Sequence, residues 1–313
     1  MEERSSRSGI SISLSIVGIL LLASSQTLAS DLEVQWQAEA REWHEQRLER
    51  LVAPFGWLSL VALEFLDDGH WSVGSAPDSD VVMISGPERW GTLMLDGMQA
   101  RFEPAAETMV RVDDEPIDST VNLVIRGDLP ASRVSAGTGW FELASRGDRL
   151  VLRARDSQAQ TRLDFLGLDY FDFDPAWRVE ARWEAHPDGT TIPIADVLGE
   201  IRDAENPGRA VFEFGGETFA LEALASGDQL FFILADRTSG RDTYGLGRFL
   251  YSDLPENGRV VLDFNRAYNP PCAFNAYTTC PLPPPENRLD VRVEAGERRY
   301  RGDGGVQAAD VKS

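Results

Sequence analysis

The sequence predicts a mainly β protein that begins with one helix. Two observations lead to this prediction. Between about residue 57 and residue 300, short apolar alternations are broken repeatedly by Gly, Pro and Asp, which is typical of antiparallel strands joined by turns. Before residue 55, apolar side chains recur at helical spacing instead. A length of 313 residues exceeds what one hydrophobic core usually fills, so we expect two β domains after the helix.

Residues 1–29 have the pattern of a secretory signal peptide. Arginines lie among the first seven residues, and the apolar run ISISLSIVGILLLA extends from Ile10 to Ala23. Thr27 and Ala29 then occupy the positions that a signal peptidase reads, which predicts cleavage after Ala29. The alternative is an uncleaved membrane anchor, but the run is shorter than the roughly 20 residues of a membrane-spanning helix. We expect an exported protein, periplasmic or extracellular, with no membrane span after cleavage of the signal.

Residues 30–55 are expected to form the N-terminal helix. Asp31 suits the positive end of a helix dipole, and Pro54 and Gly56 end the helical pattern. His44 lies among Glu and Arg residues, which favours a solvated face. The apolar residues at near-helical spacing are Leu32, Trp36, Trp43, Leu48 and Leu51.

The β-rich part divides into two domains. Residues 56–160 contain segments such as GTLMLDG and RLVLRARD at regular spacing, which predicts a β-sandwich. Residues 165–302 contain RAVFEFGGETFALEAL, RVVLDF and LDVRVEA, which predict a second antiparallel domain, sandwich or barrel-like, with a Pro-rich loop. In this half, Gly215–Gly216 predicts a two-residue hairpin, and Ile194–Arg202 one short helix. The tail, residues 303–313, is expected to be disordered.

The charge balance excludes two classes of partner. The chain has 51 acidic residues against 30 basic ones, a formal net charge of −21. Nucleic acid needs a basic surface, and anionic membrane surfaces attract basic segments, so neither is expected as a partner. The remaining partners are a small molecule or an envelope protein.

Two stretches resemble a known family. One is the run from Asp236 to Leu289, which contains NPPCAFNAYTTCPLPPPENRL, and the other is WHEQRLERLVAPFGWLSLVALEFLDDG near the start. Together they resemble the bacterial and archaeal family DUF1684, a domain of unknown function, over nearly the whole mature chain. The resemblance implies no particular reaction, because the family has no established activity.

A second resemblance lies in the first β domain. Trp71–Met83, WSVGSAPDSDVVM, resembles the start of a forkhead-associated (FHA) sandwich. In that family an Arg follows the Gly, and a Ser and a His further on hold phosphothreonine. Here Ser75 follows Gly74, and no matching Ser-x-x-His follows. The resemblance therefore implies an FHA-like shape without the family's phosphopeptide-binding residues.

A dense polar cluster precedes the Pro-rich loop and predicts a ligand pocket. On the strand RVVLDFNR, alternation places Val261, Asp263 and Asn265 on one face, and such a polar face in an apolar shell suits a small polar or anionic ligand. Asp263 is the candidate catalytic base. The candidate ligand-binding residues are Tyr244, Arg248, Asn265, Arg266, Tyr268, Asn269 and Asn287. The alternative is that these residues brace long loops through hydrogen bonds, as Asx residues beside Pro often do.

Cys272 and Cys280 are the only cysteines. In an exported chain an even number of cysteines predicts a disulfide, here one that closes the Pro-rich loop. Free thiols and a metal site are the alternatives. A zinc site would need further Cys or His ligands, and the nearest His in sequence is His186, so no metal and no cofactor are expected.

These observations predict an exported protein that binds a small polar or anionic molecule in the second β domain, with a hydrolytic step as an additional hypothesis. The alternative function is a non-enzymatic envelope interaction module that uses the loops of the FHA-like sandwich. Whether the protein is an enzyme stays open at this point.

Overall fold

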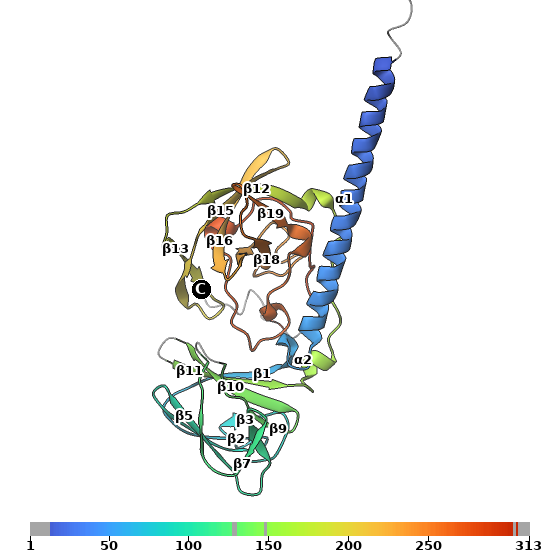
Figure 1. The fold of residues 1–313 in the computed structure, drawn as a ribbon. Coiled ribbons are helices and arrows are strands. Elements are labelled where there is room, and N and C mark those ends of the chain that lie inside the picture. Colours follow the sequence, from blue (N-terminus) through green and yellow to red (C-terminus); the bar gives the residue numbers. More distant parts are fainter. Residues whose placement is uncertain (1–12, 127–129, 147–148, 303–304, 306–313) are drawn as a thin grey trace, which may run out of the picture.

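The computed structural model describes residues 13–126, 130–146, 149–302 and 305, and for residues 13–30 it describes the backbone alone. Helix α1 (Ser13–Val52) leads into a first β unit, whose strands lie between Leu60 and Asp156, and then into a second β unit, whose strands lie between Arg178 and Asp263 and which includes the segments that follow them. Figure 1 shows the two units one above the other, with α1 alongside the upper, second unit. The prediction of a mainly β protein with an N-terminal helix is confirmed.

Helix α1 is longer than the expected helix. It begins at Ser13 rather than residue 30 and continues through the predicted cleavage point. It ends at Val52, as Pro54 predicts. Residues 1–12 of the predicted signal peptide lie outside the described residues, and its cleavage stays a prediction. Within the described residues, no helix combines the length and the apolar character needed to cross a membrane.

The buried face of α1 is partly polar. Ala40, Arg47 and Leu51 are buried at helical spacing, whereas Leu32 and Leu48, which we expected on the apolar face, are exposed. Leu51 is buried and Trp36 and Trp43 are half-buried, so the expected side is confirmed there and is wrong at Leu32 and Leu48. The polar Arg47 is buried in addition, which the apolar pattern did not indicate. The reason is that Arg47 finds a buried acidic partner in the second β unit, which a sequence pattern does not show.

The first β unit consists of two sheets packed around one core. One sheet has the order β1-β11-β10-β9-β6-β7 and the other β3-β2-β4-β5-β8, and all pairs except β2–β3 are antiparallel. Apolar side chains from both sheets, among them Trp90, Phe102 and Phe141, fill the space between them. The strands are β1 (Leu60–Leu66), β2 (Gly69–Gly74), β3 (Val81–Val82), β4 (Gly91–Asp96), β5 (Gln99–Pro104), β6 (Val110–Val112), β7 (Glu115–Ile117), β8 (Val121–Leu123), β9 (Val134–Ala136), β10 (Gly139–Arg146) and β11 (Arg149–Asp156).

The second β unit is built on a six-stranded sheet of order β18-β17-β16-β15-β12-β19. Its edge strands β18 and β19 also lie against each other, so the sheet nearly closes into a barrel around a core that includes Phe212, Phe232 and Phe264. The hairpin predicted at Gly215–Gly216 is confirmed, because these two glycines join β15 to β16. The strands of the sheet are β12 (Arg178–Ala185), β15 (Gly208–Phe214), β16 (Glu217–Ser226), β17 (Gln229–Leu234), β18 (Arg248–Asp253) and β19 (Arg259–Asp263).

The short helix predicted at Ile194–Arg202 is wrong. The structure has a hairpin there, formed by β13 (Thr191–Ala195) and β14 (Ile201–Glu205). Ile192 and Ile194 are buried while their neighbours are exposed, which is the two-residue period of a strand.

The strand predicted from LDVRVEA, Leu289–Ala295, is also absent. Backbone hydrogen bonds join this segment to Ala235 and Arg237 as far as Val291, and beyond Val291 side chains take the place of a regular ladder. The carboxylate of Asp236 accepts a hydrogen bond from the Val293 amide, and the Arg248 guanidinium donates to the carbonyls of Val293 and Ala295. Backbone groups that bind side chains are not available to a neighbouring strand.

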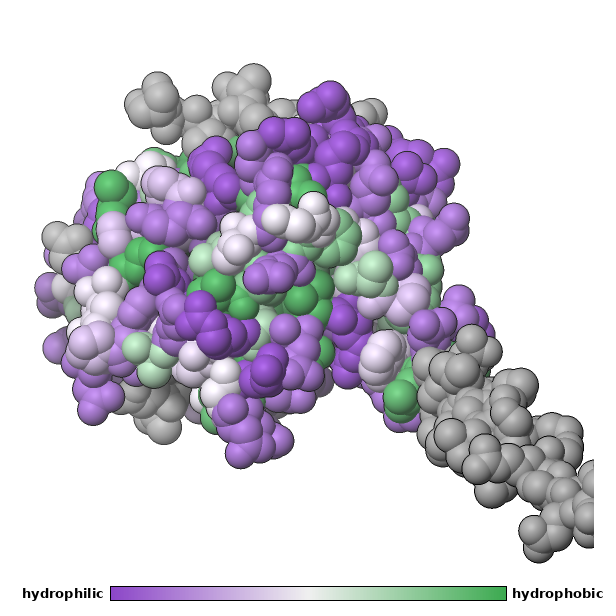
Figure 2. All heavy atoms as spheres, turned by 90° about the horizontal axis from the view of Figure 1, so that it is seen from above, coloured by the Kyte–Doolittle hydropathy of each residue, from purple (hydrophilic) through white to green (hydrophobic). Residues whose placement is uncertain are grey.

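Short helices occur where the chain turns between these strands. They are α2 (Gln160–Leu163) and the 3₁₀ helices η1 (Trp57–Ser59), η2 (Pro175–Trp177), η3 (Phe264–Arg266), η4 (Pro271–Ala273) and η5 (Pro285–Asn287). The predicted tail lies outside the described residues except for Gly305. Seen from above, the surface is mostly hydrophilic, with hydrophobic side chains gathered in a smaller central area (Figure 2), as the acidic composition leads one to expect.

Candidate functional site

The structure distributes the predicted site residues over several places instead of one pocket. Six of them are buried, and Arg266 and Tyr268 are half-buried. The buried ones are Tyr244, Arg248, Asp263, Asn265, Asn269 and Asn287.

Asp263 is the last residue of β19, and neighbouring donors bind its carboxylate. Its carboxylate lies 2.8 Å from Arg178 Nη1 and 3.4 Å from Arg266 Nε. It also accepts hydrogen bonds from the amide and from the side-chain Nδ2 of Asn265. The chain turns into η3 at this point, so the strand alternation that placed Val261 with Asp263 stops, and Val261 is exposed. These contacts describe a cap that holds a turn.

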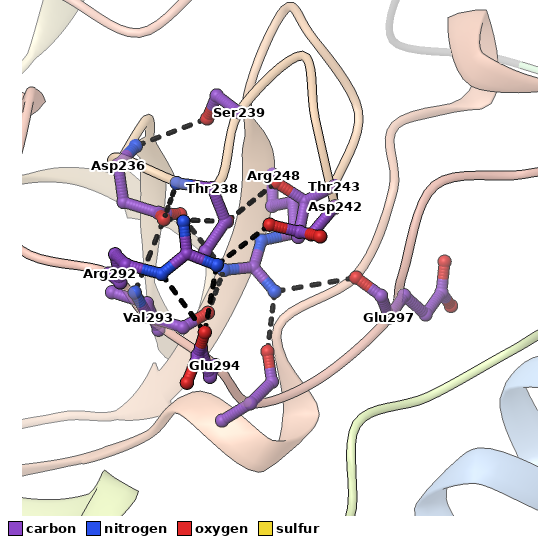
Figure 3. A network of polar contacts seen from close by, with 11 residues as sticks. Asp236, Thr238, Ser239, Asp242, Thr243, Arg248, Arg292, Val293, Glu294 and Glu297 are labelled. Atoms are coloured by element: carbon purple, nitrogen blue, oxygen red, sulfur yellow. Dashed lines mark hydrogen bonds and ion pairs between the residues drawn. The ribbon is translucent and has the colours of Figure 1, made fainter.

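Arg248 lies at the centre of a buried network (Figure 3). Its Nη2 atom is 2.9 Å from Asp236 Oδ2, with both side chains 1% exposed, and its guanidinium also donates to the carbonyls of Val293 and Glu297. Asp236 in turn accepts hydrogen bonds from the amide and the hydroxyl of Thr238. Burial lowers the pKa of Arg248, and the neighbouring Asp236 opposes that shift.

Asn287 and Asn269 cross-link backbone segments. Asn287 accepts from the Glu222 amide at 2.6 Å and donates to the carbonyls of Glu222 and Ile233, which joins η5 to β16 and β17. The Asn269 side chain donates to the Arg298 carbonyl at 2.8 Å, and the Asn269 backbone amide donates to Glu297 Oε2 at 2.9 Å.

Glu297 is fully buried beneath α1. Arg47 of the helix lies 3.1 Å from its carboxylate. Burial raises the pKa of Glu297, and the charge of Arg47 opposes that rise. The Tyr170 hydroxyl is near this carboxylate, and burial and then the Glu297 charge raise the pKa of Tyr170.

His44 of α1 does not face solvent, contrary to expectation. Its ring stacks on Tyr170 with centroids 3.7 Å apart, and its Nε2 atom lies 2.9 Å from the Asn265 carbonyl oxygen. Burial lowers the pKa of His44.

The predicted disulfide between Cys272 and Cys280 is present. The loop that it closes contacts the first β unit, because Asn275 donates to the carbonyl of Leu60 at 2.8 Å. Among the described residues, no three His, Cys, Asp or Glu side chains gather as a metal site would need.

A large cleft lies at the edge of the second β unit, with a volume of about 990 Å³. We call it the arginine cleft. Three chain segments form it, near residues 169–170, 241–244 and 298–302, and backbone hydrogen bonds from Arg298 to Asp169 and from Arg299 to Asp242 hold them together. Its arginines and tyrosines are Arg241, Arg298, Arg299, Arg301, Tyr170, Tyr244 and Tyr300.

The network of Figure 3 braces the loop that supplies one wall of this cleft. Thr238 and Thr243 join their hydroxyls across the loop at 2.8 Å, and the amides of Arg241 and Asp242 donate to the Thr238 carbonyl. The side chain of Asp242 pairs with Arg292 at 2.8 Å. The cleft wall is therefore ordered before any ligand arrives.

Gly296 allows the opposite wall of the cleft, the segment that carries Arg298, to pack closely against Ala267. Its φ is +77°, and a Cβ atom there would lie 2.4 Å from the Ala267 carbonyl oxygen. Only glycine combines this left-handed conformation with such a close contact. The turn directs Arg298 and the residues after it into the cleft.

The charges in the cleft are only partly compensated. Arg301 pairs with Asp169 at 2.7 Å, and Asp242 is already bound by Arg292. Arg298 lies over the Phe171 ring at 4.6 Å. Among the described residues, neither Arg298 nor Arg241 has a carboxylate within ion-pair distance.

Of the predicted site residues, Tyr244 alone lines the cleft. The arginines were missed, although GERRYR places Arg298, Arg299 and Arg301 within four positions of a chain rich in acidic residues. That local excess of positive charge was the available signal. The fourth arginine of the cleft, Arg241, was missed because it is far from these three in sequence.

Comparison with known proteins agrees with the resemblance in the sequence. The model of the family described as "Protein of unknown function (DUF1684)" matches residues 163–298. An uncharacterized protein of Haloarcula marismortui, with a structure solved by NMR in solution, is 35% identical, covering 44% of this chain and 78% of that one, with a TM-score of 0.37. No curated protein matches the chain. The chain belongs to the DUF1684 family of proteins of unknown function.

Proposed function

We propose that the protein binds a small anion with phosphate or carboxylate groups in the arginine cleft. The observation that carries this proposal is the pair Arg241 and Arg298, which line one cleft and lack a carboxylate partner among the described residues. These two arginines place positive charge in a concave site of a chain that has 51 acidic and 30 basic residues.

The chemistry of the arginines suits such a ligand. A guanidinium is planar, stays charged at all physiological pH values, and donates two parallel hydrogen bonds to a carboxylate or phosphate. The loop that carries Arg241 is braced by the Asp236 network, so little ordering is needed on binding. A volume of about 990 Å³ is at the upper end of the range for metabolite sites.

Binding is better supported than hydrolysis. The carboxylates that line the cleft, Asp169 and Asp242, are both paired with arginine. A general base must be free to take a proton, and neither of these carboxylates is. Asp263 has the same limitation, because Arg178 and Arg266 lie against it.

The test is calorimetric titration of the full chain with inorganic phosphate, pyrophosphate and citrate, and with glycerol as a neutral control. We expect binding of at least one anion that weakens as salt is added, because exposed charges are screened. Arg298→Gln and Arg241→Gln should each weaken it about tenfold or more, since a hydrogen bond to a charged group contributes roughly 1.5–3 kcal/mol.

The matched control is Arg101→Gln, an exposed arginine of β5 in the first unit, which should leave the affinity unchanged. Absence of binding by all three anions would contradict the proposal. So would equal affinities of Arg298→Gln, Arg241→Gln and the unchanged protein.

A further inference from the structure

The exposed aromatic side chains of this protein are concentrated in one place. Across the described residues, the exposed aromatics are Phe55, Trp57, Tyr251 and Tyr277. The first three line a pocket of about 590 Å³, and Tyr277 lines a smaller cavity of about 170 Å³ that shares Trp57 with it. Exposure of large aromatic surface is unfavourable in water, so its concentration around one pocket indicates a binding surface.

This pocket, which we call the junction pocket, lies where three parts of the fold meet. Helix α1 contributes Trp43 and Arg50, the first β unit contributes Arg155 of β11, and the second unit contributes Tyr251 of β18. Tyr268 of the second unit lines it as well, with its ring 5.6 Å from that of Trp43. Ligand sites are frequent at such junctions, because several elements can direct groups into one space.

The polar side chains of the junction pocket are mainly hydrogen-bond donors. Three arginines line it, Arg47, Arg50 and Arg155, whereas no Asp or Glu among the residues that the structure describes does so. Arg47 is engaged by Glu297, and Arg155 donates to the carbonyls of the Phe55–Gly56 turn. Arg50 is exposed and has no carboxylate partner among the described residues.

The donor-rich lining discriminates between classes of ligand. A sugar has hydroxyls that need acceptors as well as donors, and here the acceptors are the Gln229 side chain and the hydroxyls of Tyr251 and Tyr268, beside three arginines that only donate. A carboxylate needs donors alone, which arginines supply. Aromatic walls add stacking for a flat ring, since offset aromatic pairs are favourable beyond the area that they bury.

We propose that the junction pocket binds a small aromatic carboxylate, with its ring against Trp57 and Tyr251 and its carboxylate at Arg50. This site is separate from the arginine cleft. It selects for a planar apolar ring as well as for negative charge.

The test uses 2-naphthoate as the probe, titrated into the full chain and followed by tryptophan fluorescence. Two matched compounds separate the two features of the ligand: cyclohexanecarboxylate keeps the charge without the aromatic ring, and 2-naphthalenemethanol keeps the ring without the charge. We expect both to bind at least tenfold more weakly than 2-naphthoate. Equal binding of either compound, or no binding of 2-naphthoate, would overturn the inference.

Variants locate the ligand. Arg50→Gln should weaken 2-naphthoate binding about tenfold through loss of a charge-assisted contact. Arg41→Gln, on the same helix, exposed and outside the pocket, is the control and should change nothing. Trp57→Leu should also weaken 2-naphthoate binding. If the Trp57 variant does not fold, Arg50→Gln still tests the inference, because Arg50 is exposed. If Arg298→Gln weakens 2-naphthoate binding and Arg50→Gln does not, the ligand binds in the arginine cleft, and the inference is overturned.

Discussion

The buried ion pair between Arg47 and Glu297 should be essential for docking α1 onto the second β unit. Arg47→Met keeps the apolar stem of the side chain but removes its charge. Glu297, fully buried, would lose the cation at 3.1 Å and keep the hydrogen bond from the Asn269 amide. Removing one partner of a buried pair costs about 3–5 kcal/mol, because an uncompensated charge stays in the interior. The lost contact of Arg47 with the Tyr268 ring, at 4.8 Å, adds roughly 0.5–1 kcal/mol.

The loss of stability in Arg47→Met should be larger at higher pH. Burial already raises the pKa of Glu297, and Arg47 opposes that rise, so the pKa should rise further in Arg47→Met. The folded state then holds the proton more tightly than the unfolded chain. The contribution of Glu297 to the stability of the variant should be fully present below about pH 4.3, the unfolded value, and should be lost as pH rises through the folded pKa.

The assay is urea unfolding of the full chain at pH 4.5 and 7.5, followed by circular dichroism. We expect the larger loss at pH 7.5, and recovery of most of it in Arg47→Met/Glu297→Gln, because the neutral amide can be buried at lower cost. Arg41→Met, exposed on the same helix, should stay within about 0.5 kcal/mol of the unchanged protein. A loss below about 1 kcal/mol for Arg47→Met, or a loss equal at both pH values, would refute this reasoning.

Two further predictions follow from the same structure. Burial lowers the pKa of His44, so the folded state prefers the neutral ring, and the stability that this preference contributes above pH 6.5 should be lost as pH falls through the folded pKa. In thermal unfolding, His44→Gln should reduce the change of melting temperature with pH, whereas His70→Gln, at an exposed position, should not. If the melting temperature changes equally with pH in the unchanged protein and in His44→Gln, the prediction is contradicted. Replacing Cys272 and Cys280 by serine should lower the free energy of unfolding by about 2–3 kcal/mol, the value for so short a loop, and reductant should then have no additional effect. A double variant as stable as the oxidised protein would contradict this second prediction.

Local sequence patterns determined those features that depend on neighbouring residues. The hairpin at Gly215–Gly216 follows from glycines that tolerate positive φ, and the end of α1 at Val52 follows from Pro54. Strand β19 follows from apolar alternation, because Val260 and Leu262 are buried and Val261 between them is exposed. The disulfide follows from the presence of two cysteines alone.

Tertiary structure decided where these elements lie and which charges meet. His44 is half-buried and Arg47 is buried because Tyr170 and Glu297, far away in sequence, lie opposite them. The segment predicted as a strand at Leu289–Ala295 is irregular beyond Val291 because the buried Arg248 binds the carbonyls of Val293 and Ala295.

The arginine cleft shows the same division. A local pattern reveals the charge of the GERRYR segment, but it does not reveal that Arg241 joins it or that Asp169 neutralises Arg301. These contacts connect residues more than fifty positions apart, and their strength depends on distance and burial, which a one-dimensional period does not contain. The sequence by itself therefore determined the mainly β class and its family, whereas only the tertiary structure decided which side chains are buried supports and which line open sites.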